Sequence, residues 1–162
     1  MPDVIAVDAI LADSVQVSGD MKLQVQGGAW NSITAAQFPA QHDRIGVGVV
    51  IQVPYTATNQ SHTLEVSIED ADGGIVPLGS APEGVSTEDG LIRRIGGPFN
   101  IGRPPGLAPG EEQVVPFAIN LNGVKFPAPG PYCIAIFIDG NKIKSLPFKL
   151  QQVQPPLNTI LR

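Results

Sequence analysis

The stretch PYCIAIFIDGNKIKSLPFKL, residues 131–150, decides the fold because it is the clearest β-hairpin in the chain. Two apolar runs flank the turn 139–141, and a glycine at such a tight bend is a strong hairpin signal. In the first run, 133–138, isoleucine alternates with other apolar residues, so both faces are apolar. This pattern is typical of a central strand that is covered on both sides.

The second arm of this hairpin is less regular than the first. Leucine or phenylalanine occupies one face at positions 146, 148 and 150, whereas Ile143 is out of phase with them. A β-bulge near Lys144–Ser145 restores the register. Pro147 lacks an N–H group and therefore suits a sheet edge.

Alternating aliphatic residues predict further strands outside this hairpin. They lie at 4–11, 15–17 paired with 21–25, 44–53, 63–69, 75–78 and 113–121. Gly46 and Gly48 on the strand 44–53 permit the close approach of another backbone. Residues 33–42 are the one place where a short helical turn is expected. The segment 79–112 is expected to hold one short edge strand, at 91–95 or 99–101.

About eight or nine short strands with many turns predict an all-β fold, an antiparallel two-sheet β-sandwich of the immunoglobulin/C2-like kind. At most one short helical turn is expected. Residues 1–150 form the predicted domain. Residues 151–162 form a C-terminal tail with two adjacent prolines, and we expect it to dock on its own domain or on a neighbouring subunit.

Composition excludes several classes of partner. The chain has 162 residues, a net charge of −5 and ten scattered Lys and Arg residues, so it lacks the basic stripe that nucleic acid requires. No apolar run approaches the ~18 residues of a membrane span, and the N-terminus lacks a charged leader. The single Cys133 fits a reducing compartment. We therefore predict a cytoplasmic protein.

No catalytic motif stands out in the sequence. Cys133 lies in the middle of a predicted central strand, where cysteine behaves as a small apolar residue. His42 and His62 have no supporting motif, and HExxH, CxxC, GxSxG and Walker-type sequences do not occur. We therefore predict a protein that is not an enzyme, has no catalytic residues and uses no cofactor.

The acidic turn 69–74 does not fit the EF-hand pattern in either register of its glycines. Asp70, Asp72 and Asp139 would form a calcium site if they met at one end of the sandwich. Local turn chemistry also accounts for Asp and Gly at these positions. We predict no metal site and keep this cluster as the alternative.

Several elements of the sequence resemble a family of small bacterial β-sandwich proteins, an uncharacterised domain of unknown function. The elements are Asp8-Ala9, Lys22-Leu23, Gly27-Gly28-Ala29-Trp30, Phe38-Pro39 and the closing segments 129–132 and 139–140. The resemblance implies a sandwich in a bacterial cytoplasm and brings no activity. Trp30, the only tryptophan, is expected to fill the core or its rim, with a ligand platform as the alternative.

Together these observations predict a non-enzymatic binding or assembly module of unknown pathway. The expected partner is a second copy, as in a homo-oligomer, or another protein. The candidate interface consists of Phe137, Leu157, Ile160 and Leu161. Two alternatives stay open: a calcium- or small-ligand-binding C2-like sandwich, and a small hydrolase or isomerase in which His42 and His62 converge.

Overall fold

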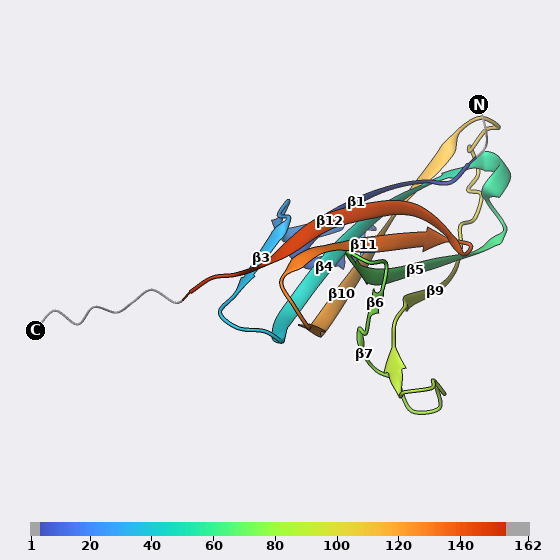
Figure 1. Ribbon diagram of the computed structural model, residues 1–162. Coiled ribbons are helices and arrows are strands. Elements are labelled where there is room, and N and C mark those ends of the chain that lie inside the picture. The colour runs from blue at the N-terminus through green and yellow to red at the C-terminus, as the bar shows by residue number, and fades with distance from the viewer. Residues whose placement is uncertain (1–3, 155–162) are drawn as a thin grey trace, which may run out of the picture.

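The computed structural model describes residues 4–154, and these form an all-β protein with two larger sheets around one core (Figure 1). The four-stranded sheet has the order β10 (Glu112–Phe126), β4 (Ala40–Pro54), β1 (Ala6–Val17), β2 (Leu23–Gly28). The six-stranded sheet has the order β3 (Ser32–Ala35), β12 (Asn141–Gln152), β11 (Gly130–Ile138), β5 (Ser61–Asp70), β6 (Ile75–Val76), and β9 (Ile95–Asn100) also pairs with β5. The strands β7 (Gly79–Ser80) and β8 (Leu91–Ile92) form a separate two-stranded ribbon.

Strand β4 lies at the centre of the first sheet and pairs with β1 and β10. Its inner face places five aliphatic side chains in the core with no exposed area, and these are Ile45, Val47, Val49, Ile51 and Val53. The predicted alternation of this strand is therefore confirmed. Burial of each such side chain contributes about 1.5–3 kcal/mol, so β4 is a large contributor to hydrophobic stability.

The outer face of β4 carries Gly46 and Gly48, and another backbone approaches there as the sequence predicted. A Cβ atom on Gly46 would lie 3.0 Å from the carbonyl carbon of Ser14 and 3.1 Å from the backbone nitrogen of Val15. The Asn120 side chain bridges the same place, because its amide donates to the Val15 carbonyl at 2.9 Å and its oxygen accepts from the Val15 N–H at 3.1 Å. The β1–β2 hairpin therefore folds over the glycine face.

The closing hairpin β11–β12 forms as predicted, with a bulge in its second arm. The register shifts between Ile136 and Phe137, which pair with Lys144 and Lys142, so the extra residue is Ile143. The predicted bulge is thus confirmed, one residue before the expected position. Pro147 belongs to the part of β12 that precedes its pairing with β3, so its missing N–H leaves no ladder bond unmade.

Strand β11 lies between β12 and β5, and both of its faces are covered. The outer face holds Ala135 and Phe137, and the guanidinium carbon of Arg94 lies 4.1 Å from the centre of the Phe137 ring. Phe137 is only 7% exposed. The chain itself therefore covers most of the ring, and the role of Phe137 at an interface stays a prediction.

The structure corrects four predictions about the elements. There are twelve strands within residues 4–154, not eight or nine, because several have only two to four residues. The predicted helical turn at 33–42 is strand β3 and the start of β4, whereas a 3-10 turn, η1, occupies Tyr55–Ala57. The predicted strands 4–11 and 15–17 are one strand, β1. The segment 79–112 holds β7, β8 and β9 instead of one edge strand.

The second sheet is mixed, because β3 pairs with β12 in parallel, while the other strand pairs are antiparallel. Strand β12 continues to Gln152, so the predicted domain boundary after residue 150 lies inside a strand. The predicted docking of the tail concerns residues 155–162, which lie outside the described part. Residues 4–154 contain no helix long and apolar enough to cross a membrane.

The close approach at Gly46 leads to a test of this packing. Gly46→Ala should lower the free energy of unfolding by about 1–3 kcal/mol, because the new methyl group would collide with the backbone of β1. Gly102→Ala is the matched control, since no atom lies within 4 Å of its added Cβ. Urea unfolding measures both, and equal stability of the two variants would contradict the packing.

Candidate functional site

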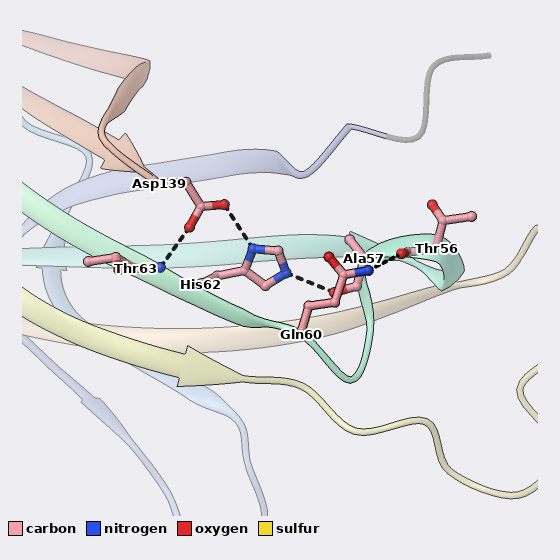
Figure 2. A network of polar contacts seen from close by, with 6 residues as sticks. All are labelled: Thr56, Ala57, Gln60, His62, Thr63 and Asp139. Atoms are coloured by element: carbon pink, nitrogen blue, oxygen red, sulfur yellow. Dashed lines mark hydrogen bonds and ion pairs between the residues drawn. The ribbon is translucent and has the colours of Figure 1, made fainter.

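The buried histidine His62 is the centre of the candidate site (Figure 2). It is the second residue of β5 and directly follows the loop that leaves η1. Its Nδ1 lies 2.8 Å from Oδ2 of Asp139, and its Nε2 lies 2.8 Å from the carbonyl oxygen of Ala57. The imidazole therefore connects the start of β5 to two loops.

Asp139 reaches His62 from the two-residue turn of the closing hairpin. Asp139 and Gly140 have φ angles of 52° and 81°, as a tight hairpin turn requires. The second carboxylate oxygen of Asp139 accepts the Thr63 N–H at 2.9 Å, and the Asp139 N–H donates to the Thr63 carbonyl at 2.9 Å. One residue thus closes the hairpin and fixes it against β5.

The two partners of His62 determine its charge. A carboxylate and a carbonyl oxygen only accept hydrogen bonds, so the two contacts form together only when both ring nitrogens donate, and this geometry favours the imidazolium form. Burial opposes this charge, but the hydrogen bonds from Asp139 and Ala57 outweigh it and raise the pKa of His62. The hydrogen bond with His62 lowers the pKa of Asp139, and the Thr63 N–H adds to that effect.

The loop that supplies the Ala57 carbonyl is held by Arg103. The Arg103 guanidinium stacks on the Tyr55 ring at 3.7 Å and donates to the Tyr55 carbonyl at 2.9 Å. Its Nε also donates to the Thr58 hydroxyl at 2.9 Å. These contacts with the residues on either side hold the Ala57 carbonyl opposite His62.

A pocket of about 340 Å³ opens beside this network. Its apolar rim includes Val4 and Ile143, both exposed, and the bulge in β12 is what turns Ile143 out of the strand's regular phase. Gln60 also lines it, and its amide donates to the Thr56 carbonyl at 2.7 Å. The side chain of Asp139 is 46% exposed, so its carboxylate remains within reach of a ligand.

His42 and His62 do not converge. His42 lies twelve residues before Pro54, the last residue of β4, whereas His62 follows just beyond the loop after Pro54. At about 3.3 Å per residue, the stretch of β4 from His42 to Pro54 spans up to roughly 40 Å, and the two histidines line different pockets. His42 instead contacts the edge of the Trp30 ring, with 6.4 Å between ring centres.

The three aspartates of the calcium alternative are also apart. Asp70 pairs with Tyr132 at one end of β11, and Asp139 follows Ile138 at the other, roughly 20 Å away along the strand. The Asp70 carboxylate accepts the N–H groups of Asp72 and Gly74, as in an ordinary turn. No group of three potential metal ligands occurs among residues 4–154.

Of the remaining candidate residues, Cys133 is the one that the structure places. Cys133 is half-buried on β11, and burial together with Glu69 raises the pKa of its thiol, which opposes a nucleophilic role. The candidate interface residues Leu157, Ile160 and Leu161 lie outside the described residues.

The pairing of His62 with Asp139 was missed from the sequence, although each residue was a candidate separately. The signal that finds it is the strand order, because β5 beside β11 brings residue 63 next to the hairpin turn. The roles of Ala57 and Arg103 have no sequence signal, since a backbone carbonyl and a loop arginine match no motif.

A comparison with known families assigns the chain. The model of a Family of unknown function (DUF6941) matches residues 7–151. The chain belongs to this family. The resemblance to an uncharacterised domain family is therefore confirmed. A search of curated proteins finds no match.

Solved structures with similar folds are distant. The alkylpurine DNA glycosylase AlkC of Pseudomonas fluorescens is 11% identical with a TM-score of 0.41, over 91% of this chain and 30% of that protein. A β-glucosidase of Listeria innocua is 10% identical with a TM-score of 0.42, over 94% and 17%. A family 123 glycoside hydrolase of Clostridium perfringens is 16% identical with a TM-score of 0.30, over 93% and 28%. The chain spans less than a third of each, and such scores assign no activity.

The charged pair predicts a defined pH dependence of stability. The raised pKa of His62 gives stabilisation that is complete below 6.5 and is lost as pH rises through the higher folded value. The lowered pKa of Asp139 gives stabilisation that is complete above 3.8 and is lost as pH falls through the lower folded value. His62→Gln should therefore cost about 1–3 kcal/mol near pH 5.5, and less at pH 9.

Chemical unfolding at several pH values measures this difference. His42→Gln is the matched control, because His42 has no carboxylate partner within residues 4–154, and it should keep the wild-type pH profile. A cost of His62→Gln that is the same at pH 5.5 and pH 9 would show that the pair is not charged.

The separation of the aspartates predicts the response to calcium. A ligand that binds the native state raises the melting temperature, and the rise grows with the logarithm of ligand concentration over Kd. Because Asp70 and Asp139 lie at opposite ends of β11, 1 mM Ca²⁺ and EDTA should give the same melting temperature. A calcium-dependent rise that Asp139→Asn removes would restore the metal alternative.

Proposed function

We propose that the protein is a non-enzymatic binding or assembly module. The observation that supports this most directly is the use of both His62 nitrogens in hydrogen bonds to Asp139 and Ala57. A general base needs a nitrogen lone pair that faces the substrate. The imidazolium has no free lone pair, so the His62–Asp139 pair fits a structural and binding role better than proton transfer.

The other reactive groups add to this support. A nucleophile needs a base within hydrogen-bonding distance. The acceptor 3.9 Å from the Cys133 sulfur is the Glu69 carboxylate, and Lys142 already donates to that carboxylate at 2.8 Å. Among residues 4–154 neither histidine contacts Cys133 by a hydrogen bond.

The scaffold suits recognition through strand edges. We infer a two-sheet sandwich of the immunoglobulin/C2-like kind from the shared core and the mostly antiparallel strands. The uncovered outer strands offer backbone groups to a partner chain, a common mode of peptide recognition. The bacterial and cytoplasmic setting stays a prediction from the sequence.

The pocket beside His62 favours a second candidate, small-ligand binding. It combines an apolar rim, Val4 and Ile143, with the exposed carboxylate of Asp139. Pockets of this composition bind small molecules that carry an apolar body and a hydrogen-bond donor. The wild-type protein and Ile143→Asp can be compared in a fragment screen by NMR, and equal binding by both would remove this candidate.

Turnover assays test the absence of catalysis. Chromogenic esters, phosphates and glycosides should be cleaved no faster with the protein than without it. His62→Gln and His42→Gln serve as paired variants at a temperature where both are folded. Turnover that His62→Gln abolishes and His42→Gln preserves would contradict the proposed function.

Light scattering tests the assembly part of the proposal. A homo-oligomer has a mass that is a multiple of the 17.0 kDa chain at micromolar concentration. A constant mass of 17.0 kDa would remove self-association and leave another protein as the partner.

A further inference from the structure

The outer edge of β3 has backbone groups available for another strand. Strand β3 is the last strand of its sheet and pairs only with β12 (Figure 1). The N–H of Lys149 donates to the Asn31 carbonyl at 3.0 Å, and that of Val153 to the Ala35 carbonyl at 3.0 Å. Bonds to one neighbour come from alternate residues. The backbone groups of Ser32 and Thr34 therefore face away from β12, where no strand of residues 4–154 pairs.

The edge of β3 lacks most of the features that usually prevent pairing. Exposed edges are commonly blocked by proline, charged residues, bulges or a very short strand, and of these β3 has only its length of four residues. Four other strands with an uncovered edge have a proline or a left-handed glycine within or next to them, namely Gly27 in β2, Pro77 after β6, Pro98 in β9 and Pro116 in β10. The sequence Ser-Ile-Thr-Ala of β3 has neither proline nor charge.

A pocket of about 300 Å³ lies at the same edge. It is lined by Asp13, Trp30, Ser32, Ile33, Thr34 and His42. The left-handed Gly27 leaves room for the side chain of Asp13, because a Cβ atom there would overlap the Asp13 carboxylate. Trp30 is positioned edge-on against Phe148, with ring centres 6.4 Å apart.

The polar chemistry of the pocket selects a cation. Among residues 4–154 the Asp13 carboxylate forms neither an ion pair nor a hydrogen bond with another side chain. An indole ring attracts Lys and Arg side chains, and a carboxylate pairs with the same groups. The net charge of −5 adds a long-range attraction for a basic partner.

We propose that the free edge of β3 pairs with an extended segment of a partner protein, and that a Lys or Arg side chain of this segment enters the pocket between Asp13 and Trp30. This inference rests on the proposed binding function and names its surface and the chemistry of its partner. Backbone pairing supplies the attachment, and the basic side chain supplies the selectivity.

Trp30 makes the test site-specific, because it is the only tryptophan in the chain. Its fluorescence is followed while the full-length protein is titrated with the peptide Ac-Thr-Thr-Val-Lys-Val-Thr-Thr-amide. One control peptide has Gln in place of Lys, and another has methylated backbone nitrogens. The Lys peptide should change the emission and bind at least roughly 10-fold more tightly than either control.

Two protein variants distinguish the contribution of the pocket to binding from that of the overall negative charge. Asp13→Asn should weaken binding of the Lys peptide roughly 10-fold or more, because the charge-assisted contact is lost. Asp43→Asn, an exposed carboxylate that does not line the pocket, should bind as the wild type does.

Three results would overturn the inference: no binding of the Lys peptide at millimolar concentration, equal binding of the Lys and Gln peptides, or full binding of the methylated peptide. The proposed function would survive each of them if turnover were still absent. Turnover that depends on His62 would contradict the proposed function independently of these results.

Discussion

The structure depends on the different residues that strand β4 presents on its two faces. Its inner face carries five aliphatic side chains with no exposed area, and its outer face carries Gly46 and Gly48. The first face joins the two sheets through one core. The second lets the β1–β2 hairpin fold back, since any larger side chain would hold the backbone of Ser14 away. Both contacts follow from a single alternating sequence.

The irregular positions of the fold carry its polar chemistry. The bulge at Ile143 places an aliphatic side chain beside the His62–Asp139 pair, and the tight turn after β11 places the carboxylate there. Bulges and left-handed turns are common next to binding sites because they redirect side chains without changing the rest of a sheet. The regular strands supply rigidity, and these two departures supply the pocket.

The sequence predicted regular features well and distant pairings poorly. Alternation along β4 and β11, the closing hairpin and its bulge all follow from local pattern. Short strands such as β6, β7 and β8 have too few residues for a period to show. The site needed the strand order, because His62 and Asp139 are 77 residues apart and meet only when β5 pairs with β11. The contact of Arg94 with the Phe137 ring was also not predicted, because it leaves no mark in the pattern of β11.

The parallel pairing of β3 with β12 has a consequence for folding order and local opening. Ser32 lies opposite Lys149, so this contact joins residues separated by more than two thirds of the chain, and closing so long a loop has an entropic cost. A four-residue strand with one neighbour repays little of that cost. Strand β3 and the adjacent Trp30 are therefore expected to assemble late. Their amide protons should exchange by local opening, while the core around β4 stays folded.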